Sequence, residues 1–428
     1  MLEILLVILF ILGYAAIALE QKLKVNKTAS ALFLAVFSWT IYSANSINTF
    51  QVNEQLSGHL ASISEILFFL LGAMTIVELI DAHQGFSFIT DRITSKNKVS
   101  LLWIVSILTF FLSSILDNLT TAIVMTSILR KLINEVNDRK IFAAMIIVAA
   151  NAGGAWSPIG DITTTMLWIG GQVTEFNIVK NLFIPCVICL LVPLIFLSFK
   201  FIGQVNKTNL SVEIDSSSSE PNGSKLILFF GIGAFIFIPV FKTITQLPPY
   251  IGMLLGLAVV WIVSEIIHAD KDEEEKKQFT IVHALSKIDS SSILFFLGIL
   301  ITIAALESAN ILSSFSQWMS IHIKNENIIV TSLGLLSAVI DNVPLIAATQ
   351  GMYDLAAHPI DSKIWEFLAY ATGTGGSILI IGSAAGIAVM GMEKIDFVWY
   401  FKKISLLALL GYFAGAITYL LLHHYVAY

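Results

Sequence analysis

The chain has 428 residues, of which 56% are hydrophobic and only 13% are charged, and its mean hydropathy is +0.84. Because soluble domains contain about 25% charged residues, this composition excludes a soluble enzyme and a nucleic-acid-binding protein. It predicts an all-α polytopic membrane protein whose main partner is the lipid bilayer. The formal net charge of −6 says little about other partners, since the orientation of a membrane protein depends on where its Lys and Arg residues lie.

Ten apolar runs approach the roughly 20 residues that a helix needs to cross a bilayer. They lie at about 2–20, 28–47, 62–82, 141–171, 177–200, 225–242, 249–268, 290–308, 365–391 and 399–421. Positive charges follow the first run and do not precede it, which favours a retained helix over a cleaved signal peptide. Two further runs, 99–131 and 328–350, could each be a single span or a re-entrant hairpin.

The distribution of Lys and Arg decides between these two topologies. If both further runs are hairpins, twenty of the 24 basic residues fall on one face of the membrane. If both are single spans, twelve fall on each face. Because cytoplasmic loops are enriched in Lys and Arg, the count predicts two hairpins and places the N- and C-termini on the periplasmic side.

The two halves of the chain repeat each other. Ile66–Gly72 resembles Ile293–Gly298, and Asn151–Asp161 aligns with Gly373–Ser383. Each half then has five spans and one hairpin, and because five is odd, the second half is inverted relative to the first. The predicted parts are a first repeat at 1–202, a cytoplasmic linker at 203–224 and a second repeat at 225–428.

Each hairpin run carries an Asp-Asn pair within an apolar stretch. Asp117–Asn118 is followed by Thr120–Thr121, and Asp341–Asn342 repeats the pair, with Ser113 and Ser337 four residues before the aspartates. A charge at the centre of a bilayer costs several kcal/mol, so a membrane aspartate indicates a functional site. The alternative is that these aspartates only cap the N-termini of helices at the hairpin tips.

Two spans contain glycine-rich breaks. Pro158 and its neighbouring glycines interrupt the run at 141–171, and four glycines interrupt Thr372–Ser383. A broken helix frees backbone carbonyls, which coordinate cations in transporters with discontinuous helices. The repeat is asymmetric here, because Asp161 stands opposite Ser383. We therefore expect a site built mainly around Asp161 and the first hairpin, which Asp341 completes or gates.

The four interrupted elements contain carboxylates, amides and hydroxyls but no Lys or Arg. Oxygen ligands with negative charge suit hard cations such as Na⁺ or Li⁺. Desolvation favours the protonated form of a carboxyl group, so the same oxygens could exchange a proton for a cation. The candidate ion- and proton-binding residues are Asp117, Asn118, Thr120, Thr121, Asn151, Ser157, Asp161, Thr163, Thr164, Ser337, Asp341, Asn342, Thr374 and Ser377, with Asp117, Asp161 and Asp341 as Na⁺ ligands.

The motifs SSILDNLTT, NAGGAWSPIGDITTTMLW and SAVIDN together resemble the NhaD-type sodium/proton antiporters of the ion-transporter superfamily, which also contains arsenite, citrate and dicarboxylate carriers. The resemblance covers nearly the whole chain. It implies a scaffold domain with dimer contacts (spans at about 1–82 and 177–200) and a transport domain (about 99–171 and 328–391) that moves as an elevator. It also implies the cytoplasmic (inner) membrane of a bacterium. The polar positions of the family motifs fall on Asp117, Asn118, Asn151, Asp161, Thr163, Thr164, Asp341 and Asn342, and more loosely on Ser337 and Ser377.

The sequence therefore predicts a secondary active antiporter that exchanges Na⁺ or Li⁺ for H⁺ by alternating access, without a cofactor and without enzymatic activity. The main alternative is a Na⁺-coupled carrier of small carboxylates or other anions with the same fold, although the interrupted elements contain no basic residue that would bind an anion. An intramembrane aspartyl protease is disfavoured because the chain lacks a Gly-x-Gly-Asp motif. A passive channel is disfavoured by the inverted halves with broken helices.

Overall fold

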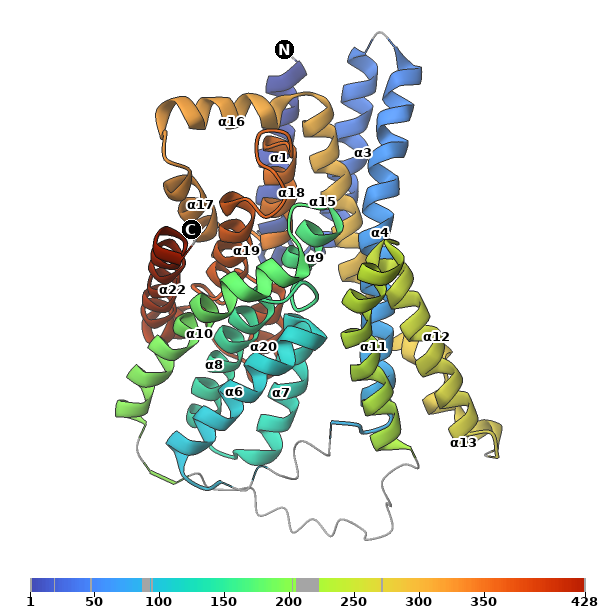
Figure 1. Cartoon of the computed structure of the whole chain (residues 1–428), viewed down its shortest axis with the longest axis vertical. Coiled ribbons are helices and arrows are strands. Elements are labelled where there is room, and N and C mark those ends of the chain that lie inside the picture. The colour runs from blue at the N-terminus through green and yellow to red at the C-terminus, as the bar shows by residue number, and fades with distance from the viewer. Residues whose placement is uncertain are drawn as a thin grey trace.

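The structure, a computed structural model, describes residues 2–18, 20–46, 48–86, 93, 95–201, 203–204, 223–270 and 272–426. Over these residues the chain is helical and forms no β-strand (Figure 1). Seven of the described helices combine the length and the apolar composition needed to cross a membrane. The prediction of an all-α polytopic membrane protein is therefore confirmed.

The elements follow the chain order expected for two halves. The helices of the first half are α1 (Leu2–Ala18), α2 (Glu20–Leu23), α3 (Lys27–Asn45), α4 (Thr49–Ala82), α6 (Lys98–Leu116), α7 (Asn118–Leu132), α8 (Val136–Ala155), α9 (Ile162–Ile169) and α10 (Glu175–Lys200). The second half contains α11 (Ser224–Thr245), α12 (Pro249–Ile267), α13 (Glu273–Lys276), η1 (Lys277–Phe279), α14 (Ile281–Lys287), α15 (Ser290–Ser308), α16 (Ile311–His322), α17 (Glu326–Leu336), α18 (Asn342–Met352), α19 (Lys363–Gly375), α20 (Ala384–Glu393), α21 (Phe397–Tyr400), the π-helical turn η2 (Phe401–Ser405) and α22 (Leu406–Val426). Most of the predicted linker at 203–224 lies outside the described residues.

Both predicted helix breaks are present. α8 ends at Ala155 and α9 begins at Ile162, while α19 ends at Gly375 and α20 begins at Ala384. Two helical features were not predicted. α4 starts at Thr49, well before the expected span at about 62, because Asn48 accepts hydrogen bonds from the backbone N–H groups of Phe50 and Gln51 and caps its first turn. α16 fills a segment without a predicted element and runs across the top of the view in Figure 1.

The chain reverses direction at the first Asp-Asn pair. Lys98, at the start of α6, forms a 2.6 Å ion pair with Asp138 in the first turn of α8. Since α8 follows the end of α7 after only a short turn, the start of α6 and the end of α7 lie on the same side of the molecule. α6 and α7 lie side by side in the lower half of Figure 1.

The second Asp-Asn pair also lies between two helices whose outer ends are close together. Ser316 and Ile321 of α16, which leads into α17, share a cavity wall with Met352 and Tyr353 at the end of α18. α17 packs on α19, and α18 packs on α15, α16 and α9. The two helices occupy the upper half of Figure 1, opposite α6 and α7.

α8 is the central helix of one group of helices. Every residue from Phe142 to Ala155 is buried, which is the pattern of a helix surrounded on all sides. It is packed by α6, α7, α10, α19 and α20. At the lower end of this group, the buried Glu393 of α20 accepts hydrogen bonds from Arg130 Nε (2.7 Å) and Arg139 Nε (2.5 Å), which ties α20 to α7 and α8.

A second group consists of α1, α3, α4, α11, α12, α14 and α15, which pack on one another. α4, α11 and α12 stand apart from the α8 group on the right of Figure 1. α10, which the sequence assigned to the scaffold spans, packs instead on α22, α8 and α19. Its apolar faces alone could not reveal which neighbours it has.

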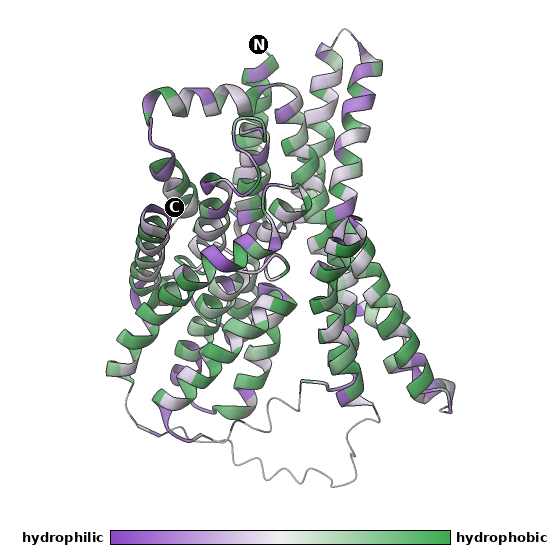
Figure 2. Ribbon diagram, viewed as in Figure 1, coloured by the Kyte–Doolittle hydropathy of each residue, from purple (hydrophilic) through white to green (hydrophobic). Residues whose placement is uncertain are grey.

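The outer surface is apolar. Phe199, Phe229 and Ile244 are 76%, 72% and 74% exposed, and Figure 2 shows hydrophobic residues along most of α10, α11 and α12. Large contiguous apolar surfaces are unfavourable in water. We therefore assign these faces to contact with lipid.

The glycine at position 153 allows α8 and α6 to touch through their backbones. A Cβ atom at Gly153 would lie 2.2 Å from the carbonyl oxygen of Phe110. We expect Gly153→Ala to lower the thermal unfolding midpoint of the purified protein in detergent, although Gly→Ala in a helix otherwise stabilises by about 1 kcal/mol. The matched control is Gly58→Ala in α4, where a Cβ meets nothing within 4 Å and where we expect an unchanged or higher midpoint. Equal midpoints for the two variants would contradict the close backbone contact.

Candidate functional site

Asp161 lies in the break between α8 and α9 and is only 1% exposed. Its Oδ1 accepts a hydrogen bond from the backbone N–H of Thr163 (3.0 Å), which caps α9, and its Oδ2 accepts one from Asn118 Nδ2 (2.8 Å). The break can approach the first hairpin because residue 160 is glycine: a Cβ there would lie 2.7 Å from the carbonyl oxygen of Ser113. The buried carboxylate thus joins a helix start to a hairpin tip.

Asn151 of α8 extends this network to the second half of the chain. Its Oδ1 accepts a hydrogen bond from Asn118 Nδ2 (3.1 Å). Its Nδ2 donates to the hydroxyl groups of Ser377 and Ser383, each at 3.0 Å. We refer to Asn118, Asn151, Asp161, Ser377 and Ser383 as the central polar cluster. It joins the first hairpin tip, α8 and both helix breaks.

Ser383 was not among the predicted site residues, although its alignment with Asp161 pointed to it. Its side chain caps α20 by accepting a hydrogen bond from the backbone N–H of Gly386 (3.1 Å). Three helix N-termini therefore meet at the central polar cluster: those of α7, α9 and α20.

Asp117 and Asp341 cap the helices that follow the two hairpin tips. Asp117 accepts from the backbone N–H of Thr120 (2.9 Å) and from its hydroxyl group (2.7 Å), with its own backbone at φ = 75°. This value is strained for a residue with a side chain. Asp341 accepts from the backbone N–H of Val343 (3.2 Å), and Tyr14 of α1 lies beside its backbone. The capping role anticipated for all three aspartates is thus present.

Two buried polar groups at the hairpins have no hydrogen-bond partner among the described residues. They are Oγ1 of Thr121 in α7 and Nδ2 of Asn342 at the start of α18. Buried polar groups are normally paired. Unpaired groups beside both Asp-Asn pairs are consistent with a polar ligand there.

Four other predicted site residues use their side chains to shape the local backbone. Three of the hydrogen bonds run to backbone carbonyls: Thr164 to Asp161 (2.9 Å), Thr374 to Tyr370 (2.6 Å) and Ser337 to Thr372 (2.8 Å); in the fourth, Ser157 accepts from the backbone N–H of Ile159 (3.4 Å). Ser113 donates to the carbonyl of Ala150 (2.6 Å), so the serines four residues before the two hairpin aspartates make equivalent contacts.

The three predicted Na⁺ ligands do not form one metal cage. Within the described ranges, no group of three or more His, Cys, Asp or Glu side chains lies close enough together to hold a metal ion. Asp117 and Asp341 lie within electrostatic range of Asp161. A cation at Asp161 would therefore take its remaining ligands from amides and hydroxyls.

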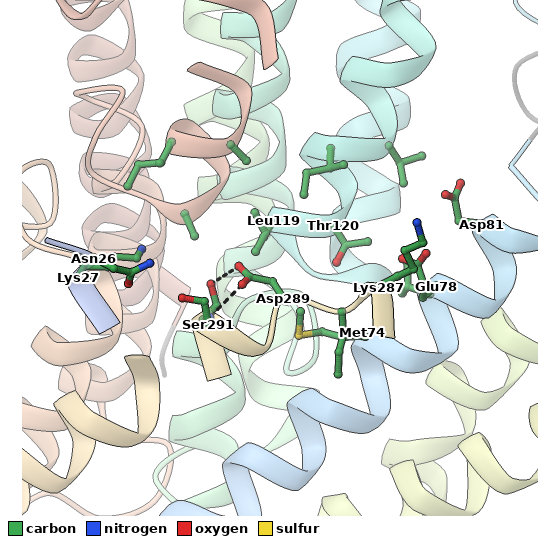
Figure 3. A pocket seen from close by; sticks show the side chains of 18 of the residues that line it. Asn26, Lys27, Met74, Glu78, Asp81, Leu119, Thr120, Lys287, Asp289 and Ser291 are labelled. Carbon is green, nitrogen blue, oxygen red and sulfur yellow. Dashed lines mark hydrogen bonds between the residues drawn. The ribbon is translucent and has the colours of Figure 1, made fainter. Parts of the chain in front are cut away.

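A cavity of about 410 Å³, here called the vestibule, leads to the first hairpin tip (Figure 3). It lies between α4 and the α14–α15 connection on one side and α7 and α20 on the other, and Thr120 forms part of its wall. The charged residues of its wall are four acids and two bases: Glu20, Glu78, Asp81, Asp289, Lys27 and Lys287. This excess of negative charge attracts cations toward Thr120 and Asp117.

The chain is similar to known transporters over most of its length. The model of the citrate transporter family matches residues 7–373. Sodium/proton antiporter 1 of Arabidopsis thaliana is 48% identical over 99% of this chain and 73% of its own length, and sodium/proton antiporter 2 of the same plant is 47% identical over 98% and 99%. The Na⁺/H⁺ antiporter NhaD of Vibrio cholerae is 30% identical over 97% of this chain and 91% of its own length.

Asn151 makes three of the hydrogen bonds that hold the central polar cluster together. We expect Asn151→Ala to destabilise the protein by about 1–3 kcal/mol, because its buried partners lose their bonds. Thermal unfolding in detergent measures the effect. The control is Ser106→Ala in α6, since the buried Ser106 hydroxyl has no partner among the described residues and its removal should not destabilise. An Asn151→Ala protein as stable as the control would argue against a cohesive cluster.

Proposed function

Because the chain belongs to the citrate transporter family and, within it, groups with NhaD-type Na⁺/H⁺ antiporters, we propose that it is a secondary active antiporter that exchanges Na⁺ for H⁺ across a membrane. The observation that carries this proposal is the central polar cluster. It surrounds one buried carboxylate, that of Asp161, with amide and hydroxyl groups and contains no basic side chain. Such ligands suit a hard monovalent cation, and Li⁺ has the same ligand preference.

The amide of Asn118 marks the position of the cation. Its nitrogen donates both to Oδ2 of Asp161 (2.8 Å) and to Oδ1 of Asn151 (3.1 Å). We infer that Na⁺ takes the place of this amide nitrogen between the two oxygens. A rotated Asn118 would then offer its own Oδ1 as a further ligand, since an amide carries a donor and an acceptor on one flat group.

Competition between Na⁺ and H⁺ for Asp161 supplies the coupling. Oδ2 of Asp161 can carry a proton or coordinate Na⁺, and one excludes the other. Bound Na⁺ and the bound proton each neutralise the buried carboxylate, whereas a bare charge would be costly to carry across the membrane. The carrier therefore crosses with one of the two ions.

The helix N-termini argue against a carboxylate substrate. The N-termini of α7, α9 and α20 carry partial positive charge, which would favour an anion. Asp117 and Asp161 already supply carboxylates to two of them. This arrangement favours a Na⁺/H⁺ antiporter over the alternative, a Na⁺-coupled carrier of small carboxylates.

Alternating access would use the two groups of helices described above. We propose that the two halves are inverted repeats, each with a re-entrant hairpin, and that the α8 group, including α10 and α22, moves as an elevator against the group of α3, α4, α11 and α12. The matching contacts of Ser113 and Ser337 and the opposite positions of the hairpins in Figure 1 support this. The vestibule lies toward the ends of α6 and α7, where basic residues predict the cytoplasm, so we infer an inward-facing conformation.

Three further features follow from the resemblance and the charge distribution. We propose a homodimer, termini on the periplasmic side and, as the sequence predicts, the cytoplasmic membrane of a bacterium. The similar proteins come from a plant as well as from bacteria. Multi-pass insertion in a membrane is common to all of these assignments.

Asp161→Asn tests the central role of the carboxylate. We expect Na⁺-dependent H⁺ flux in everted vesicles to fall at least about ten-fold, while the cap of α9 is kept because Asn caps helices as well as Asp. The matched control is Asp396→Asn: Asp396 is exposed and caps α21 by accepting from the N–H of Trp399 (3.2 Å). Wild-type flux in Asp161→Asn protein that folds normally would refute the assignment.

Substrate competition separates the two candidate functions. In proteoliposomes with an imposed pH gradient, we expect ²²Na⁺ exchange to proceed without any carboxylate and to be unaffected by saturating citrate or succinate. Unlabelled Li⁺ should compete with ²²Na⁺, because it prefers the same oxygen ligands. Na⁺-dependent uptake of labelled citrate or succinate would instead favour the carboxylate carrier.

A further inference from the structure

Lys242 of α11 contacts the end of α9 that is farthest from Asp161. α9 begins at Asp161, its N-cap, and ends at Ile169. The Lys242 ammonium group donates to the carbonyl oxygen of Trp168 (3.2 Å) and lies 4.4 Å from the centroid of the Trp168 ring. Carbonyls in the last turn of a helix lack partners within it and form the negative end of its dipole. A cation at this point therefore stabilises α9 in its present position.

Glu175, the first residue of α10, makes a second connection between the same parts. Its Oε2 accepts a hydrogen bond from Trp168 Nε1 (3.1 Å), and its Oε1 accepts one from the hydroxyl group of Thr243 in α11 (2.8 Å). Trp168 is fully buried, and Lys242 is half-buried. We call these four residues, Trp168, Glu175, Lys242 and Thr243, the latch.

The other contacts of this chain segment stay within the α8 group. Gln350 of α18 donates to the carbonyl of Met166 (3.3 Å) and to Oε1 of Gln172 (2.9 Å). α9 and α18 also pack directly on each other. α11 packs mainly on α12 and α4. The latch thus joins the two groups of helices, whereas Gln350 joins parts of one group.

We propose that Lys242 is a positioning residue whose latch with Glu175 holds the α8 group in the conformation with the open vestibule, and that the latch opens in every transport cycle. The inference rests on the proposed function, in which the two groups move against each other. A contact that exists in only one of two conformations lowers the free energy of that conformation alone. If Lys242 instead served only as a local cap for α9, its loss would lower stability and leave the balance of conformations unchanged.

A cross-link tests whether the latch must open. In the pair Glu175→Cys/Thr243→Cys, oxidation should reduce Na⁺/H⁺ exchange at least about ten-fold, and a reductant should restore it, because a closed latch traps one conformation. The matched pair is Gln172→Cys/Gln350→Cys, whose side chains are equally close but belong to one group, so its oxidation should leave exchange intact. Normal exchange by the oxidised latch pair overturns the proposal. Absence of exchange in the wild type would refute only the proposed function.

A second measurement tests Lys242 without measuring transport. Ala388 lines the vestibule, and the two native cysteines are buried, so the labelling rate of Ala388→Cys by an impermeant thiol reagent reports vestibule opening. We expect Lys242→Met to slow labelling about three-fold by shifting the population and Lys242→Arg to restore it. Lys180→Met removes an exposed charge at the same end of α10 as Glu175 and should have no effect. Unchanged labelling in folded Lys242→Met protein, or an equal effect of Lys180→Met, overturns the role of Lys242.

Discussion

The constraint on which this structure depends is that a helix interrupted inside an apolar environment exposes backbone groups that must find partners. Each of the helices that restart after an interruption has a side chain for this purpose: Asp117 for α7, Asp161 for α9, Asp341 for α18 and Ser383 for α20. The residues that satisfy the backbone are therefore those that supply oxygen to an ion. Capping and ion binding are one arrangement, because a carboxylate that accepts from a backbone N–H keeps lone pairs for a cation.

Close backbone contact keeps these interruptions rigid. Gly160 and Gly382 occupy matching places in the two breaks, and a Cβ at either would lie 2.7 Å from carbonyl oxygens of the facing hairpin tip, at Ser113 and Ser337 respectively. The serines in turn donate to α8 and α19. A site that must hold oxygen atoms in fixed positions benefits from such support, since misplaced ligands bind an ion weakly.

The sequence predicted the parts of this fold that depend on local chemistry. Glycine and proline located both breaks, and the distribution of Lys and Arg identified the hairpins. Asp161 emerged as the main carboxylate because its repeat partner is Ser383. The sequence could not predict contacts that depend on tertiary packing. α10 is apolar on all sides, so its neighbours were unknown, and the ammonium group of Lys242 reaches a carbonyl 74 residues away. The first turns of α4 were missed because they are polar and depend on the Asn48 cap.

The helix N-termini explain how one family fold can serve ions of opposite charge. An N-terminus stabilises a carboxylate whether that group belongs to a substrate or to the protein itself. Here Asp161 supplies the carboxylate from within the chain and is held by the N–H of Thr163 and by Asn118. Once this charge is built in, an anionic substrate would meet a carboxylate instead of a free N-terminus, and the unmet requirement is for a cation or a proton. The exchange of Na⁺ for H⁺ is then the chemistry that the buried aspartate leaves open.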